Sequence, residues 1–131
     1  MDRKMFQKGA LIFREGDTSD CMYAVNSGRV GVYAAYGTAE EKLLAEYTQD
    51  GYFGEMGLLE HAPRSAAAVA LEDNTCLEAV NEENFLVYFR EHPEQVLRIM
   101  QQLSWNLRKV SRDYAETCRR IAELSAQEGA K

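Results

Sequence analysis

The chain has no proline or glycine between Pro93 and Gly129, which predicts one long helix that begins near Pro93. The segment from Glu94 to Leu124 spans roughly 46 Å at about 1.5 Å per residue. A compact domain of this chain length is only about 35 to 40 Å across. We therefore expect part of the helix to project from the domain that precedes it.

Apolar residues on this helix recur at alternating steps of four and three, the a and d pattern of a coiled coil. The pattern predicts pairing with a partner helix, and the alternative is a helix that lies wholly on its own domain. The stripe comprises Val96, Met100, Leu103, Leu107, Val110, Tyr114, Thr117, Ile121 and Leu124. We expect a homodimer, with contacts through Leu103, Leu107, Val110, Tyr114 and Ile121.

Short strands separated by turn signals fill residues 1–80. "ALIF" precedes the turn residues Gly16 and Asp17, and "CMYAV" leads through "NSG" into "RVGVY", which predicts a hairpin at residues 26–28. "KLLAEYT" follows a polar loop. "AAAVAL" and "TCLEAV" flank a polar break at residues 72–74 and predict another strand pair. This spacing predicts a β-barrel or jelly roll.

A short helix is expected after the last strand, because Asn81 is a good N-cap and two glutamates follow it. This helix should run to about Arg90. The predicted fold class is therefore mainly β with C-terminal α.

Composition and hydropathy are typical of a globular protein and do not suggest a membrane-spanning or secreted one. The 131 residues suit one domain, and 46% hydrophobic with 27% charged residues is typical of globular chains. No apolar run approaches the ~20 residues of a membrane span, and the N-terminus lacks a signal-peptide core. We therefore expect a cytoplasmic protein with no membrane partner.

Cysteines and histidines show no metal-ligand spacing, so no metal is expected. Cys21, Cys76 and Cys118 are predicted to be small buried thiols, and His61 and His92 lie far apart. Residues 95–125 hold six basic and three acidic residues, which leaves a balance of −9 for the rest of a chain with net charge −6. This acidic body argues against direct DNA contact.

The segment "FGEMGLLEHAPRSA", residues 53–66, contains Arg64, the only Lys or Arg between Lys42 and Arg90. Its glycines do not form the GxGxxG pattern, and the chain shows no GxSxG elbow or P-loop lysine. Gly54 allows close backbone approach, "EMGLLE" can form one helical turn, and Arg64 can bind two phosphate oxygens. The segment therefore favours a single anion, and Glu55 suits a sugar hydroxyl.

This segment resembles the phosphate-binding cassette of the cyclic nucleotide-binding domain, the sensor module of catabolite-activator-type (Crp/Fnr-like) regulators. "KGALIFREGDTSDCMYAVNSGRVGVY" resembles the opening strands of that family, and "HPEQVLRIMQQLSWNL" resembles the start of its long helix. The resemblance implies an eight-stranded jelly-roll barrel over residues 1–92 with its cassette at residues 53–66. It also implies a helix over residues 93–126 that acts as lid and dimerisation element.

By position, the resemblance implies that Gly54, Ser65 and Arg64 bind the cyclic phosphate and that Glu55 binds the ribose 2′-hydroxyl. Met56, Leu58 and Ala66 would complete the pocket, and Ser111 on the long helix would contact the base. Val110 occupies the place of a second expected hydroxyl. The ligand would be cAMP, possibly cGMP, with no further cofactor.

The expected function is a regulatory module without enzymatic activity that signals through its long helix. One alternative is the effector-binding part of a transcription regulator whose helix-turn-helix is not in this chain. Another is a degenerate pocket or one for a different effector such as haem, with His61 or Cys76 as axial ligand. A metal-dependent jelly-roll enzyme would need clustered histidines, which the sequence lacks. Glu55 and Arg64 could also form only an ion pair with each other.

Overall fold

The computed structural model describes residues 2–129, and the chain divides into two compact units, Met1–Pro93 and Glu94–Lys131. The first unit contains the strands and two short helices, α1 (Glu55–Glu60) and α2 (Glu82–Glu91). Its strands are β1 (Asp2–Phe6), β2 (Leu11–Phe13), β3 (Cys21–Ser27), β4 (Val30–Ala34), β5 (Lys42–Tyr47), β6 (Tyr52–Phe53), β7 (Ala67–Ala70) and β8 (Thr75–Asn81). The long helix α3 (Pro93–Gly129) begins at the last residue of the first unit and forms the described part of the second.

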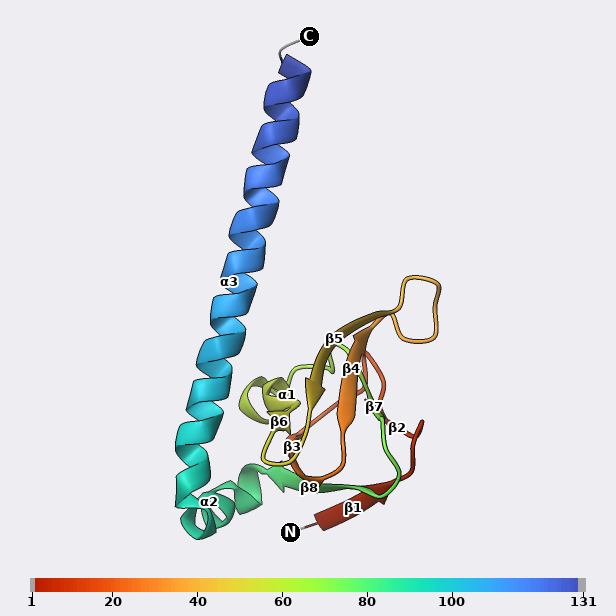
Figure 1. Cartoon of the computed structure of the whole chain (residues 1–131). Helices are drawn as coiled ribbons and strands as arrows, with labels where there is room; N and C mark the ends of the chain where they lie inside the picture. Colours follow the sequence, from red (N-terminus) through yellow and green to blue (C-terminus); the bar gives the residue numbers. More distant parts are fainter. Residues whose placement is uncertain (1, 130–131) are drawn as a thin grey trace. The chain divides into compact units, whose positions relative to one another are not determined.

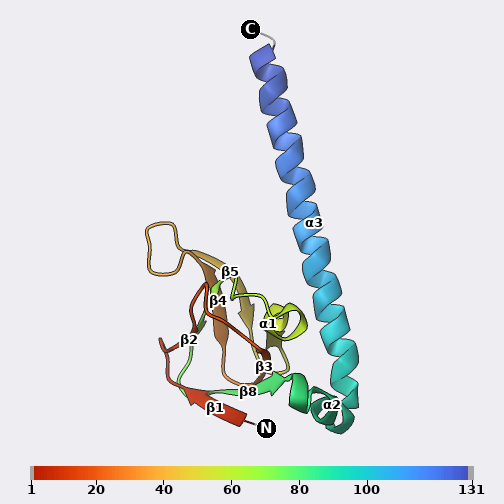
Figure 2. The ribbon, with the colours of Figure 1, turned by 180° about the vertical axis from the view of Figure 1, so that it is seen from behind.

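Among the described residues, the strands of the first unit form two four-stranded antiparallel sheets (Figure 1). One sheet has the order β1-β8-β3-β6 and the other β2-β7-β4-β5. The view from behind shows the same arrangement, with the β4–β5 loop extending away from both sheets (Figure 2). The predicted class, mainly β with C-terminal helices, is confirmed.

The core of this unit is built from inward-facing residues of both sheets. Val30 of β4 and Leu77 of β8 are fully buried, and Phe53 of β6 is almost so. Tyr23, Val25 and Ala68 complete the cluster of buried residues. Tyr23 and Val25 alternate along β3, and β-branched and aromatic residues of this kind are favoured in strands, whereas β7 is buried along its whole length.

Both predicted strand pairs are wrong, although the strands themselves are present. β3 and β4 belong to different sheets, and so do β7 and β8. The "NSG" turn and the break at residues 72–74 therefore carry the chain from one sheet to the other. Gly28, in the first of these turns, has φ +88°, a conformation that glycine adopts easily. This conformation is compatible with a crossing between sheets as well as with a hairpin.

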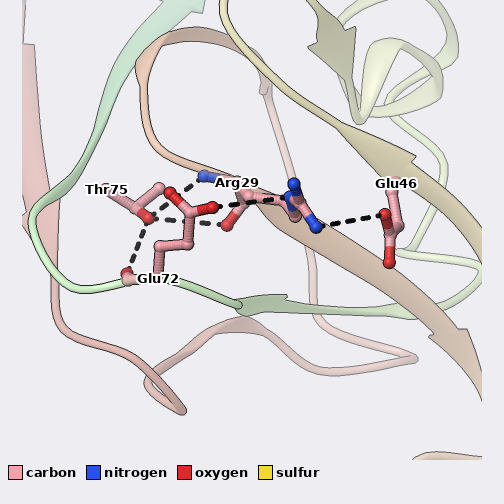
Figure 3. Close-up of polar contacts among 4 residues, drawn as sticks. All are labelled: Arg29, Glu46, Glu72 and Thr75. Atoms are coloured by element: carbon pink, nitrogen blue, oxygen red, sulfur yellow. Dashed lines mark hydrogen bonds and ion pairs between the residues drawn. The ribbon is translucent and has the colours of Figure 1, made fainter.

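The two crossings pack against each other through Thr75 and Arg29 (Figure 3). The Thr75 hydroxyl donates to the Glu72 carbonyl at 2.8 Å, and the Thr75 side chain occupies the space that a Cβ on Gly28 would need. Arg29 forms ion pairs with Glu72 at 3.6 Å and with Glu46 of β5 at 3.9 Å. These contacts connect β4, β5 and the β7–β8 turn at this end of the unit.

The predicted short helix is confirmed as α2, with Asn81 as its N-cap. The Asn81 side chain accepts a hydrogen bond from the Asn84 amide at 3.0 Å, and the Asn84 side chain accepts one from the Asn81 amide at 2.8 Å. This reciprocal pair satisfies two amides that the first helical turn leaves without a partner.

Asn81→Ala is expected to lower the free energy of unfolding by about 1 kcal/mol, because one of these amides loses its acceptor. Chemical denaturation measures the change. Asn81→Ser retains a capping oxygen and should stay close to the wild-type stability. Equal losses in both variants would contradict a capping role.

The long helix predicted from residue 93 is confirmed as α3. Of the residues predicted to contact a partner helix, Leu103 is half-buried, and Leu107, Val110, Tyr114 and Ile121 are exposed. Cys118 is also exposed, so its prediction as a buried thiol is wrong, whereas Cys21 and Cys76 are half-buried. Among the described helices, none combines the length and apolarity that crossing a membrane requires.

Candidate functional site

A cavity of about 160 Å³ in the first unit collects most of the residues that the sequence nominates. It lies where β2, β4, β5 and β6 meet α1 and the loop that follows this helix. Its lining residues are Phe13, Val32, Tyr47, Phe53, Gly54, Glu55, Met56, Gly57, Pro63, Arg64, Ser65 and Ala66.

Arg64 is the charged centre of this cavity, and its side chain is buried, with only 7% of the residue exposed. Its Nη1 donates to the Gly54 carbonyl at 2.9 Å, and its Nη2 donates to the Cys21 carbonyl at 3.0 Å. Both partners are neutral. Within residues 2–129, no carboxylate forms an ion pair with this guanidinium.

The backbone of Arg64 is fixed by the turn after β2. Its amide donates to the Asp17 carbonyl at 2.8 Å, and its carbonyl accepts from the Gly16 amide at 2.7 Å. The Asp17 carboxylate in turn accepts from the Arg14 amide at 2.9 Å, which stabilises the turn. The "REGD" segment therefore determines where the arginine enters the cavity.

Position 54 requires glycine for two reasons, its backbone conformation and the lack of space for a side chain. It precedes α1 with φ +76°, and a Cβ at this position would lie 2.5 Å from Arg64 Nη1. A side chain would therefore displace the guanidinium or the helix start. Gly57 is similarly crowded, because its Cβ would collide with the Ser19 side chain.

The other nominated residues fall into three groups. Glu55, Met56, Ser65 and Ala66 line the cavity with Gly54 and Arg64. Leu58 is buried in α1, at 4% exposure, without being among the lining residues. Ser111 lies on the exposed surface of α3 in the second unit. The ligand contacts assigned to all these residues stay predictions.

The alternative that Glu55 and Arg64 merely pair with each other does not describe the geometry. Within residues 2–129, Glu55 and Arg64 do not form an ion pair with each other, whereas Arg29 pairs with Glu46 and Glu72 and His61 pairs with Glu82. Glu55 is half-buried at the start of α1, where a carboxylate is favoured by the helix dipole. It therefore lines the cavity beside Arg64 without neutralising it.

His61 is exposed, as expected, at the C-terminus of α1. Its Nε2 lies 3.4 Å from a Glu82 carboxylate oxygen, and the residue does not line the cavity. The described residues contain no group of three or more His, Cys, Asp or Glu side chains that could hold a metal ion.

The sequence did not nominate the aromatic wall of the cavity. Phe53 stacks on Tyr23 and Tyr47 with ring centroids 5.4 Å and 5.7 Å apart, and Phe13 lies 6.0 Å from Phe53. The period-two alternation of apolar residues in the strands was the one available signal. It marks inward-facing positions but does not show which of them approach Arg64.

Burial raises the pKa of Tyr23 from 10.0 to about 12; nearby Cys21 adds to this rise, and Arg64 opposes it. Between pH 10 and pH 12, Tyr23 loses its phenolic proton in the unfolded chain but keeps it in the folded chain. The free energy of unfolding should therefore be unaffected by this group below pH 10 and should fall as the pH rises toward 12. Denaturant titrations across this range should show a weaker fall in Tyr23→Phe than in the wild type. Tyr36→Phe, at an exposed tyrosine, is the control. An unchanged slope in Tyr23→Phe would contradict this assignment.

Comparison with known proteins now identifies the family of this fold and cavity. The family model described as "Cyclic nucleotide-binding domain" matches residues 3–92. The chain belongs to the cyclic nucleotide-binding domain family. The match spans both sheets, α1, α2 and all the cavity residues of the first unit.

Curated and solved relatives of this family agree with the match. The chain is 37% identical over 91 residues to the cyclic AMP receptor protein of Thermus thermophilus, covering 70% of this chain and 42% of that protein. The crystal structure of the Thermus thermophilus catabolite activator protein superposes with a TM-score of 0.70 at 34% identity, covering 84% of this chain and 51% of that one. This chain spans less than half the length of the curated relatives that it matches first.

A further solved relative is the EAL enzyme Bd1971. Its cAMP-bound form has a TM-score of 0.59 at 33% identity and covers 83% of this chain and 29% of that one. Its cGMP-bound form has a TM-score of 0.58 at 31% identity and covers 77% and 27% of the two chains. This cyclic nucleotide-binding fold therefore also occurs within a larger enzyme.

Proposed function

We propose that this chain is a regulatory module that binds a cyclic nucleotide, with cAMP as the first candidate, and that it has no catalytic activity of its own. The cyclic phosphate pairs with Arg64 and contacts Gly54 and Ser65. Glu55 accepts a hydrogen bond from the ribose 2′-hydroxyl. The barrel is the family's eight-stranded jelly roll, and residues 53–66 are its phosphate-binding cassette.

The observation that carries this proposal is the buried Arg64 guanidinium, which has neutral carbonyl partners. A buried cation without a counter-charge is costly, and an anion in the adjoining cavity removes that cost. A singly charged cyclic phosphate matches one arginine, and the guanidinium fork suits two phosphate oxygens. The polar lining offers no lysine, which multiply charged phosphates usually recruit.

Isothermal titration with cAMP and cGMP in parallel tests the proposal, after carried-over nucleotide has been removed by unfolding and refolding. We expect micromolar or tighter binding of at least one of them. The cAMP-bound and cGMP-bound forms of the EAL enzyme make both ligands reasonable candidates. Absence of binding to both would overturn the proposal and leave the fold assignment intact.

We further propose that α3 covers the base through Ser111 and mediates homodimerisation. The apolar stripe supports the dimer, because Leu107 and Tyr114 are 68% and 72% exposed in the single chain. Large apolar side chains at coiled-coil spacing are stabilised when a second helix covers them. A cytoplasmic location stays a prediction from the sequence.

Replacing Leu107 and Tyr114 together by glutamate is expected to leave a folded monomer, since buried like charges oppose helix pairing. Analytical ultracentrifugation measures the mass in solution, and circular dichroism checks the fold. Gln101→Glu with Arg108→Glu places two acidic residues on another face of α3 and should leave the dimer intact. A dimer that persists in the Leu107/Tyr114 variant would place the interface elsewhere.

A second candidate function is the effector-binding part of an activator-type transcription regulator. The likeness to the Thermus thermophilus catabolite activator protein favours it, because this chain superposes on that structure with a TM-score of 0.70 at 34% identity. We expect this chain to make no direct DNA contact itself. A mobility shift of duplex DNA by the chain, with or without cAMP, would contradict that expectation.

A further inference from the structure

Three sides of the Arg64 guanidinium are held by this chain. The carbonyls of Gly54 and Cys21 accept hydrogen bonds at 2.9 Å and 3.0 Å. The ring of Phe13 lies against the guanidinium carbon, with 4.2 Å between that carbon and the ring centroid. The Tyr23 ring is more distant, at 5.6 Å. Phe13 is therefore the aromatic side chain closest to the charge.

An aromatic face stabilises a buried cation without using its hydrogen-bond donors. The attraction between a cation and a ring face strengthens when water is excluded, and Arg64 is only 7% exposed. A guanidinium carries five N–H donors. The carbonyls of Gly54 and Cys21, and the Cys21 thiol at 3.7 Å, account for the hydrogen bonds of Arg64 within residues 2–129. Donors therefore remain for an anion.

The Phe13 ring is itself held in place by its neighbours. It stacks on Tyr23 with 6.1 Å between ring centroids and contacts Phe53 at 6.0 Å. Its backbone belongs to β2, which pairs with β7. A ring fixed on two sides and anchored in a sheet has few alternative orientations, so it restricts those of the guanidinium as well.

We infer that Phe13 is a positioning residue of the anion site: its ring compensates and orients the buried Arg64 guanidinium so that the remaining donors face the ligand phosphate. This inference rests on the proposed function for the identity of the ligand. Phe13 acts through Arg64, and its aromatic face, rather than its volume, is the property that matters.

The test separates the aromatic face from packing volume. Phe13→Leu keeps an apolar side chain and removes the ring, whereas Phe13→Tyr keeps the ring. Phe13→Leu should weaken cAMP binding by about 2- to 30-fold in titration calorimetry, and Phe13→Tyr should bind within about twofold of the wild type. Tyr33→Leu is the matched control, because this half-buried aromatic residue packs on Tyr36 and does not line the cavity.

A second readout does not depend on any ligand. Guanidinium proton resonances of Arg64, assigned by their loss in Arg64→Lys, should show an upfield ring-current shift in the wild type and in Phe13→Tyr. The shift should be lost in Phe13→Leu. Because removal of the ring abolishes its ring-current shift in either case, the deciding readout is whether the Nη protons give separate resonances. In Phe13→Leu these resonances should merge through faster rotation and exchange if Phe13 orients Arg64, and should stay separate if Phe13 only fills space.

The outcomes are distinguishable. Wild-type affinity in Phe13→Leu, or equal weakening in Phe13→Leu and Phe13→Tyr, would overturn the inference and leave the proposed function standing. A wild type that binds neither cAMP nor cGMP would overturn the proposed function. In that case, the guanidinium resonances still decide whether Phe13 orients Arg64.

Discussion

Arg64→Ala is expected to weaken cyclic nucleotide binding by about 30- to 5,000-fold, which corresponds to about 2 to 5 kcal/mol. The substitution removes the one cation that lines the cavity and leaves the ligand phosphate buried without a charge partner. Titration calorimetry with cAMP and cGMP measures the loss. Arg64→Lys should be intermediate, because an ammonium keeps the charge but loses the two-pronged geometry of the guanidinium.

Arg29→Ala is the matched control for this prediction. Arg29 belongs to the same unit, but its side chain is 46% exposed, pairs with Glu46 and Glu72, and does not line the cavity. Exposed ion pairs contribute little to stability, so this variant should fold and bind like the wild type. Unchanged affinity in Arg64→Ala, or an equal loss in Arg29→Ala, would exclude Arg64 as the phosphate ligand.

Gly54→Ala is expected to weaken binding by about 10- to 100-fold, through a change of one methyl group. The new Cβ would lie 2.5 Å from Arg64 Nη1, so the guanidinium must shift away from the position set by its two carbonyl partners. The donors then lose their alignment with the phosphate. Calorimetry measures the affinity, and thermal unfolding reports the accompanying change in stability.

Gly37→Ala is the matched control, because it introduces the same backbone strain as Gly54→Ala without a collision with Arg64. Gly37 has φ +80°, close to the +76° of Gly54, but no atom lies within 4 Å of the place where its Cβ would be. Both variants place alanine in the left-handed region, and only Gly54→Ala should reduce ligand affinity. If Gly37→Ala reduced affinity as much, the effect would come from general destabilisation and not from Arg64.

The parts of the fold that depend on residues close together in the sequence could be predicted from the sequence. Asn81 with its following glutamates marks the start of α2, and the absence of glycine and proline after Pro93 marks the length of α3. These features depend on neighbours along the chain, so they are visible in the sequence. The pairing of strands is not local, because Gly28 permits either a hairpin or a crossing between sheets.

The candidate site likewise contains residues that the sequence could predict and residues that it could not. The isolation of Arg64 in the sequence indicated an anion, and the structure places it in the cavity with Gly54 and Glu55. Phe13 lies about fifty residues before Arg64, and nothing in its local sequence indicates that the two side chains meet. The exposure of Cys118 likewise depends on which face of α3 it occupies, which its chemistry alone does not reveal.

The position of β8 within its sheet has a consequence for how the domain is made. β8 pairs with β1 on one side and with β3 on the other, so Asp2 pairs with Ala79 and Cys21 pairs with Asn81. Long-range pairings of this kind slow folding, because a large loop must close before any contact forms. During synthesis β1 has no partner strand in this sheet, and β3 has only β6, until residues 75–81 have left the ribosome, so we expect the four-stranded sheet to be completed only then.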